Sequence, residues 1–244
     1  MQIKYKRILL KFSGEALAGG PNKFGIDPEV IDKLVQDIGQ LVKLKVQVGL
    51  VIGGGNLFRG KTLADCGLVD RVTGDQIGML ATIINALVFR DAFEHAGFES
   101  VVMSAVPIVG MVNFYNHKDA IYHLEKNRVV IFAAGTGNPL VTTDSAASLR
   151  ALEINAEIFL KATQVNGIYP SDPKKHGHLE HHTKLTYTEV LRQELAVMDL
   201  NAFIQCRDYG MKIIVFNINK PNSLLNIIYG KQEGTLVENV PDNT

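Results

Sequence analysis

The chain has 244 residues, enough to bury a large hydrophobic core, and we expect residues 1–244 to form a single domain. Its 25 lysine and arginine residues balance 25 aspartate and glutamate residues. This balance excludes the strong basic field with which proteins attract nucleic acid or an anionic membrane, so neither is an expected partner. Any anionic ligand must be held by local geometry.

The amino terminus and the cysteines predict a cytoplasmic protein. Residues 1–11 carry basic side chains around only three consecutive apolar residues, too short a stretch for a signal peptide, and no apolar run predicts a membrane span. Cys66 and Cys206 are the only cysteines and lie far apart in the sequence. They exclude a disulfide framework and a cysteine-rich zinc site.

Short apolar runs alternate with longer segments of helical period along the chain. This alternation is typical of an α/β fold in which β-α units build a mostly parallel sheet. The predicted strands are residues 6–12, 46–52, 100–105, 128–134, 157–161, 212–216 and 235–237. The predicted helices are a segment that begins at Pro28 and keeps an apolar stripe to Leu41, and residues 75–95, 118–126, 144–155, 188–207 in two pieces, and 223–229.

Two of these helices carry clear local signals. Asp27 and Pro28 are a typical N-cap and first-turn pair for the first helix. The long helix 75–95 is followed by Gly97, a common helix terminator. The apolar residues expected on the inward face of this long helix are Ile77, Leu80, Ile84, Leu87 and Val88.

Residues 55–62, directly behind the apolar run 46–52, match the Walker A pattern G-x-x-x-x-G-K-[ST]. A P-loop favours small interior residues, because its backbone wraps closely around phosphate, whereas this segment contains Leu57, Phe58 and Arg59. Gly67 interrupts the helix that should follow, and the only Walker B candidate, residues 195–199, lies in a helical pattern. The pattern therefore favours another phosphate site or an ordinary glycine-rich turn over a P-loop.

Ligands of open α/β sheets bind beyond the carboxyl ends of the strands, and two of the turns expected there are rich in glycine and cations. In the first turn, Lys11, Ser13 and Gly14 follow the apolar residues 8–10. In the second, the glycines of residues 53–55 allow close approach to an oxyanion, and the guanidinium group of Arg59 can bind phosphate oxygens.

Two further turns follow later strands. Residues 135–139 lead into Thr143 or Asp144, which can cap the next helix, while the preceding amides can bind an anion. Residues 161–163 are followed by Tyr169 and Asp172. Each turn alone has a purely structural explanation. Three turns of this type and Lys11 at one sheet edge together predict a phosphate site.

Residues 169–185 are rich in proline, lysine and histidine and predict an exposed excursion from the sheet. The excursion contains His176, His178, His181 and His182. Lysines surround these histidines and no His-Glu-x-x-His spacing is present. A solvated loop is therefore favoured over a metal cluster, and no protein metal site is expected.

Residues 11–15, 51–60, 74–75, 134–146 and 160–172 resemble, in this order, the amino acid kinase family, and within it the bacterial members that phosphorylate UMP. The likeness runs from Tyr5 to about Val237, and residues 135–144 are its most diagnostic part. It implies a three-layer α/β/α sandwich without a Walker loop. It also implies transfer of the ATP γ-phosphoryl group to UMP in de novo pyrimidine nucleotide synthesis, with Mg²⁺ bound mainly through nucleotide phosphates.

The resemblance assigns roles to individual residues. The implied catalytic residues are Lys11, Arg59, Asp144 and Asp199, with Asp144 orienting Lys11. The implied ATP-binding residues are Lys11, Phe12, Ser13, Gly14, Gly55, Arg59, Thr163, Tyr169 and Asp172. The implied UMP-binding residues are Gly54, Asp75, Thr136, Gly137, Asn138, Pro139, Leu140, Val141, Thr142 and Thr143, of which Asp75 would accept hydrogen bonds from ribose and Thr143 would read the uracil edge.

The resemblance further implies a homohexamer that GTP activates and UTP inhibits. Arg90 and Arg128 would contribute to a GTP site between subunits, although the basic residue expected near Val101 is absent. Two alternatives stay open. One is a related enzyme that phosphorylates a carboxylate or carbamate, against which residues 136–144 argue, and the other is a non-catalytic sensor of uridine nucleotides.

Overall fold

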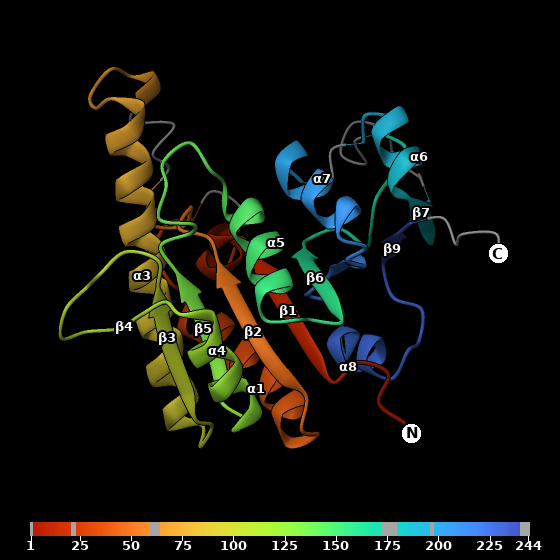
Figure 1. The fold of residues 1–244 in the computed structure, drawn as a ribbon, viewed down its shortest axis with the longest axis horizontal. Helices are drawn as coiled ribbons and strands as arrows, with labels where there is room; N and C mark the ends of the chain where they lie inside the picture. The colour runs from red at the N-terminus through yellow and green to blue at the C-terminus, as the bar shows by residue number, and fades with distance from the viewer. Residues whose placement is uncertain (1, 21–22, 59–63, 172–179, 196–197, 240–244) are drawn as a thin grey trace.

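The computed structural model describes residues 2–20, 23–58, 64–171, 180–195 and 198–239. It contains a nine-stranded sheet with the order β4-β3-β5-β2-β1-β6-β8-β9-β7 (Figure 1). The strands are β1 (Arg7–Phe12), β2 (Gln47–Ile52), β3 (Ser100–Ser104), β4 (Asn113–Phe114), β5 (Val129–Ala133), β6 (Ile158–Thr163), β7 (Lys184–Thr186), β8 (Ile213–Asn217) and β9 (Thr235–Glu238).

Helices connect these strands and cover both faces of the sheet. They are the 3₁₀ helix η1 (Gly14–Ala18) and the α-helices α1 (Pro28–Lys43), α3 (Arg71–His95), α4 (His117–Glu125), α5 (Thr143–Glu153), α6 (Tyr187–Arg192), α7 (Leu200–Asp208) and α8 (Ser223–Ile228). Within the described chain the strand pairings are parallel, except that β8 and β9 run antiparallel. Parallel strands need crossover connections, which are usually helices.

The central strand β1 shows how the sequence builds three layers. Its side chains alternate between the two faces, so Ile8, Leu10 and Phe12 enter one hydrophobic cluster and Leu9 enters the other. Residues of α1, α3 and α8 complete the first cluster, and residues of α4, α5, α6 and α7 complete the second. The predicted α/β/α sandwich around a mostly parallel sheet is confirmed.

Most predicted elements are present, with boundaries that differ by a few residues. Asp27 caps α1 by accepting a hydrogen bond from the Glu29 amide, and Pro28 is the first helical residue, as predicted. Helix α3 begins at Arg71 instead of residue 75, because Asp70 caps it by accepting the Thr73 amide. The short strands β4 and β7 were not predicted.

The predicted inward face of α3 is wrong at two positions. Leu80 is 51% exposed and Ile84 is 47% exposed. The buried side chains of α3 include Ala81, Ile83, Ala86, Phe89 and Phe93. Helix α3 has apolar residues around most of its circumference, so helical periodicity alone could not show which side faces the sheet.

The length and composition of α3 differ from the expectation that no apolar run is long enough to span a membrane. By length and composition it could cross a membrane, with a mean hydropathy of 1.4 over its most apolar window. The core helices of globular proteins meet the same criterion. Helix α3 packs against β3, β5 and α1, and Phe89 and Phe93 are fully buried there.

Candidate active site

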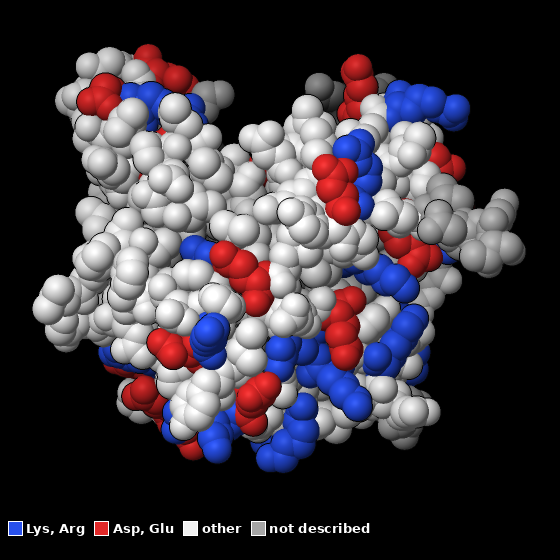
Figure 2. Space-filling model, viewed as in Figure 1, with Lys and Arg blue, Asp and Glu red and all other residues white. Residues whose placement is uncertain are grey.

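The arrowheads of β2, β5 and β6 point towards the top of Figure 1, so the carboxyl ends of these strands lie at one edge of the sheet. In the space-filling view, a notch opens above this edge between the lobe of α3 and the lobe of α6 and α7 (Figure 2). Few charged side chains are visible in the notch. The predicted turns after β1, β2, β5 and β6 all lie at this edge.

The central feature of this edge is a carboxylate held by two lysines. Lys11 on β1 and Lys161 on β6 are neighbours across the parallel strand pair. The Lys11 Nζ lies 2.7 Å from Asp144 Oδ1, and the Lys161 Nζ lies 2.6 Å from Asp144 Oδ2. The structure therefore shows the contact between Asp144 and Lys11 that the predicted orienting role requires. Lys161 belongs to the fourth of the predicted phosphate turns, but the resemblance assigned it no catalytic or binding role.

The three charges perturb one another. Burial raises the pKa of the Asp144 carboxyl, but the ammonium groups of Lys11 and Lys161 outweigh burial and hold that pKa below its usual range. Burial and the nearby charge of Lys11 lower the pKa of Lys161, although Asp144 opposes both effects. The two ammonium groups bring positive charge to this edge of the sheet, which suits a polyanionic ligand.

Asp199 joins this group through hydroxyl groups. Its carboxylate accepts hydrogen bonds from the Thr142 Oγ1 and, at 2.8 Å, from the Ser145 Oγ. It also caps α7 by accepting the Ala202 amide at 2.9 Å. Asp199 therefore connects the amino-terminal ends of α5 and α7 and supports the residues around Asp144.

The cap of α5 is Thr142, one residue before the two candidates that the sequence suggested. The Thr142 Oγ1 accepts hydrogen bonds from the amides of Asp144 and Ser145, each at 3.2 Å. Because Thr142 caps the helix, the carboxylate of Asp144 is available to the two lysines.

The glycines of the turns after β1 and β2 allow these two turns to lie close to each other. The Gly53 amide donates a hydrogen bond to the Phe12 carbonyl at 3.1 Å. A Cβ atom on Gly14 would lie 2.6 Å from the Gly55 nitrogen and 2.7 Å from the Gly53 oxygen. A side chain at position 14 would therefore push the two turns apart.

A pocket of about 140 Å³ brings together several predicted acceptor-side residues. The predicted residues in its wall are Gly54, Gly55, Asp75, Val141 and Thr143. Its wall also contains Phe58, Gly74, Gly78, Met79, Thr82 and Gly135. Gly78 and Thr82 were not predicted, although the Gly74–Gly78 spacing, one helical turn, could have indicated an open helix face.

Asp75 and Thr82 hold the loop that follows β5. Asp75 accepts a hydrogen bond from the Leu140 amide at 2.8 Å and forms an ion pair with Arg71. The Thr82 Oγ1 accepts the Ala134 amide at 2.8 Å. The remaining predicted residues of this loop lie outside the pocket wall, namely Thr136, Gly137, Asn138, Pro139, Leu140 and Thr142.

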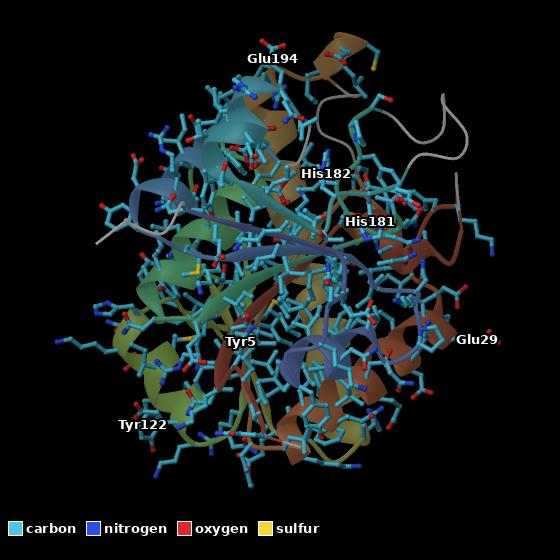
Figure 3. The ribbon with its side chains drawn as sticks, turned by 90° about the vertical axis from the view of Figure 1, so that its right-hand side faces the viewer. Tyr5, Glu29, Tyr122, His181, His182 and Glu194 are labelled. Carbon is cyan, nitrogen blue, oxygen red and sulfur yellow. The ribbon has the colours of Figure 1, made fainter. Side chains whose placement is uncertain are left out.

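The predicted ATP-side residues are only partly brought together. The Thr163 Oγ1 donates to the Val165 carbonyl at 2.8 Å, close to Lys161 in sequence. The Tyr169 ring lies 5.9 Å from the ring of His181, and His181 and His182 lie near one another in Figure 3. Arg59 and Asp172 lie outside the described residues, as do Lys61, His176 and His178.

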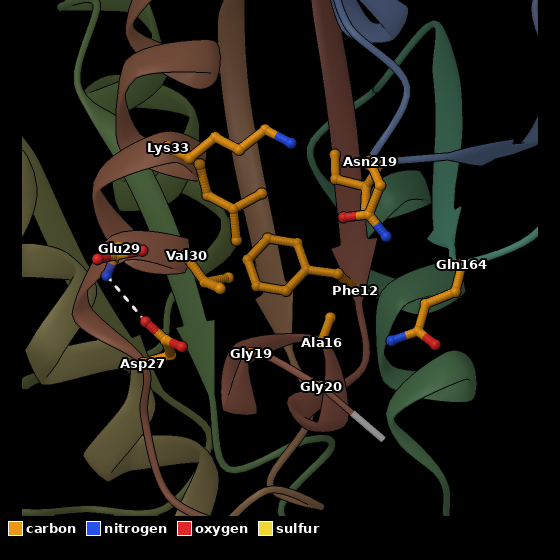
Figure 4. Close-up of a pocket in the computed structure, with 12 residues that line it drawn as sticks. Phe12, Ala16, Gly19, Gly20, Asp27, Glu29, Val30, Lys33, Gln164 and Asn219 are labelled. Carbon is orange, nitrogen blue, oxygen red and sulfur yellow. Dashed lines mark hydrogen bonds between the residues drawn. The ribbon is translucent and has the colours of Figure 1, made fainter. Parts of the chain in front are cut away.

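Phe12 points away from Lys11. Its ring packs against Phe89, with centroids 5.4 Å apart, and lines a second cavity of about 520 Å³ on the α1 side of the sheet (Figure 4). The wall of this cavity also includes Val30, Lys33 and Gln164. It is the larger cavity, but Lys11, Asp144 and Lys161 are not part of its wall, so it is not the candidate active site.

Arg90 and Arg128, the predicted effector residues, each contact an acidic side chain. Arg90 pairs with Asp91 at 3.0 Å, and Arg128 pairs with Glu99 at 2.6 Å. A shallow cavity is lined by Arg128, His123, Glu94 and Glu99, but Arg90 is not part of its wall. Among the described residues, no group of three histidine, cysteine, aspartate or glutamate side chains could hold a metal ion.

Comparison with known proteins gives a consistent result. The model of the amino acid kinase family matches residues 6–217. The uridylate kinase of Pseudomonas fluorescens is 58% identical over 237 residues, which cover 97% of this chain and 95% of that protein. The UMP kinase of Bacillus anthracis superposes with a TM-score of 0.92 at 38% identity, covering 98% of this chain and 97% of that one.

The UMP kinase of Ureaplasma parvum superposes with a TM-score of 0.89 at 36% identity, covering 97% of this chain and 100% of that one. These likenesses extend over the sheet, its helices and the edge that carries Lys11, Asp144 and Lys161. The chain therefore belongs to the amino acid kinase family and is similar to the uridylate kinases and UMP kinases named above.

Proposed function

We propose that this protein is a UMP kinase that transfers the γ-phosphoryl group of ATP to UMP, giving UDP and ADP. The observation that carries the proposal is the buried group of Lys11, Asp144 and Lys161 beside a pocket that contains Asp75 and Thr143. The similarity to uridylate kinases over nearly the whole chain supports UMP as the acceptor.

The chemistry needs charge and alignment more than a base. In phosphoryl transfer through a loose transition state, the protein positions two polyanions in line and neutralises them. The UMP phosphate is already ionised and can attack directly. Lys11 and Lys161 supply positive charge to the transferred group, Asp144 fixes both ammonium groups, and the glycine turns offer backbone N–H groups.

On the acceptor side, Asp75 accepts hydrogen bonds from ribose hydroxyls and Thr143 contacts the uracil edge. Asp75 is held in place by Arg71 and the Leu140 amide. The loop residues Thr136 to Thr142 enclose the rest of UMP. On the donor side, Ser13, Gly14 and Gly55 bind the ATP phosphates with Arg59, and Thr163, Tyr169 and Asp172 bind the nucleoside.

Mg²⁺ fits this site as a cation bound mainly by nucleotide phosphates. The Asp144 carboxylate is paired with Lys11 and Lys161, and the Asp199 carboxylate accepts three hydrogen bonds, so most of the acceptor positions of both groups are already used. Asp144 would orient water in the Mg²⁺ shell. The bound ion would supply further neutralisation of phosphate charge.

The outer face of α3 supports assembly into a homohexamer. Val72, Leu80 and Ile84 are exposed there, and an apolar groove between α1 and α3 is lined by residues such as Val35 and Val88. A second copy of the chain would cover this surface. We further infer a single-domain cytoplasmic enzyme of de novo pyrimidine synthesis, inhibited by UTP and activated by GTP with contributions from Arg90 and Arg128.

A coupled assay of ADP release tests the proposed acceptor. UMP is expected to be phosphorylated faster than CMP, acetylglutamate or carbamate. Faster turnover of any of these would overturn the assignment in favour of another kinase activity. Tight UTP binding without ADP release from any acceptor would instead identify a uridine-nucleotide sensor.

A further inference from the structure

Two asparagine side chains are buried behind the glycine turns. Asn56 is 1% exposed and Asn85, on α3, is 0% exposed. Burying a primary amide is costly unless each polar atom finds a partner. Neither residue belongs to the predicted site, so their burial calls for a physical explanation.

The two amides bind each other and the surrounding backbone. The Asn85 Nδ2 donates to the Gly53 carbonyl and to Asn56 Oδ1, both at 2.8 Å. The Asn56 Nδ2 donates to the Gly25 carbonyl at 2.9 Å and to Asn85 Oδ1 at 3.1 Å. All four amide hydrogens of the pair are therefore used.

The pair also contacts the turn after β1. A Cβ atom on Gly14 would lie 2.5 Å from Asn56 Oδ1, so the backbone of Gly14 packs directly against this amide. The same asparagine belongs to the turn after β2, whose Gly53 carbonyl binds Asn85. The pair thus connects both phosphate turns to α3, which also carries Asp75 and Gly78 of the acceptor pocket.

We propose that Asn85, acting through Asn56, is a positioning residue that sets the spacing of the two glycine turns. The inference rests on the proposed kinase function, because these turns then offer their amides to the transferred phosphoryl group. In-line transfer tolerates little displacement, and a shift of about 1 Å can cost about 10²-fold in rate. Loss of the pair therefore lowers kcat more than it raises KM.

The test compares Asn85→Ala and Asn85→Asp with Phe93→Leu. Phe93 is equally buried on α3 and packs against Phe89, so its variant reports a loss of core stability. We expect kcat for UMP to fall about 10- to 100-fold in the Asn85 variants, with less than about a threefold change in KM. Phe93→Leu lowers Tm and keeps kcat at 25 °C.

Asn85→Asp adds a pH signature that a loss of stability does not give. Its carboxylate would face two acceptors, the Gly53 carbonyl and Asn56 Oδ1, and burial raises the pKa of such a group. The protonated form can donate one of the lost hydrogen bonds. The kcat of Asn85→Asp relative to the wild type is therefore expected to rise as the pH falls from 8 to 6.

Wild-type kcat in both Asn85 variants would overturn the positioning role and leave the UMP kinase function intact. Absence of ADP release from the wild-type protein with UMP would overturn the function instead. In that case, amide hydrogen exchange still tests the positioning role, because it does not depend on kinase activity. Faster exchange of the Gly14 and Gly53 to Asn56 amides in Asn85→Ala than in Phe93→Leu supports the role, and equal exchange refutes it.

Discussion

Lys11 and Lys161 are directly opposite one another on neighbouring parallel strands, and both ammonium groups contact the carboxylate of Asp144. Like charges on adjacent positions of a sheet repel, so this arrangement is stable only with the bridging anion. When the two lysines also face the transferred phosphoryl group, each contributes to turnover.

The first prediction separates this site from the Walker A pattern. Lys11→Ala is expected to lose about 10²- to 10³-fold in kcat, because a preorganised charge facing the transition state is removed. Lys61→Ala is expected to keep most of its activity. The coupled ADP assay measures both after circular dichroism confirms folding, and an inactive Lys61→Ala with an active Lys11→Ala would favour the P-loop.

Lys161→Met is predicted to lower kcat about as strongly as Lys11→Ala. The thioether fills a similar volume without charge, so packing is largely kept while the second cation is lost. Lys184→Met is a suitable control, because Lys184 is an exposed lysine on β7 that pairs with Glu238. Equal turnover of Lys161→Met and the control would show that Lys161 does not act in catalysis.

Asp144→Asn is predicted to lower the free energy of unfolding, and to lower it more at neutral pH than at acid pH. The pKa of Asp144 is held below its ordinary value of 3.8, so its ionised form stabilises the folded state above that value. This contribution is lost as the pH falls through the lowered pKa. Urea unfolding measures the free energy of unfolding of the wild type and of Asp144→Asn. The difference between the two values should become smaller below about pH 4.

Gly78→Ala is predicted to stabilise the protein and weaken acceptor binding. No atom lies within 4 Å of a Cβ at this position, which lies inside α3 and lines the acceptor pocket. Replacing glycine by alanine within a helix raises the free energy of unfolding by about 0.5–1 kcal/mol. Thermal unfolding should show a higher Tm, and steady-state kinetics a higher KM for UMP, whereas an unchanged KM would place UMP elsewhere.

Leu80→Glu is predicted to prevent formation of the proposed homohexamer without unfolding the chain. Leu80 is half exposed on α3, so a charge there is tolerated in one subunit but not beneath a second copy. Leu200→Glu provides the control, since Leu200 is 59% exposed on α7, outside this surface. Light scattering after gel filtration measures the mass. Equal masses for both variants and the wild type would exclude this face as an interface.

The sequence predicts the central strands well, because strands buried on both faces appear as uninterrupted apolar runs. It does not predict β4 and β7, since two or three residues leave no periodic pattern. The resemblance predicts roles for Lys11 and Asp144, whereas Lys161 is predicted only as part of a turn near the phosphate site. The position of Lys161 depends on the pairing of β1 with β6, which are distant in sequence.

Asn85 illustrates the same limit. A polar residue in an apolar helix shows no sequence signal of its partner, and its contacts with Asn56 and Gly53 exist only after α3 docks. The orientation of α3 itself was predicted wrongly at Leu80 and Ile84. The sequence therefore indicates which side chains carry the chemistry better than it indicates which face of an apolar helix is buried against the rest of the chain.

The pairing of β1 with β6 has a consequence for synthesis of the protein. A nascent chain that ends after β5 contains Lys11 and both glycine turns, but neither Asp144 nor Lys161. Contacts between segments so distant in sequence form late in folding, since loop closure must come first. Catalytic competence would thus arise only after the carboxyl-terminal half has been translated and β6 has inserted beside the first strand.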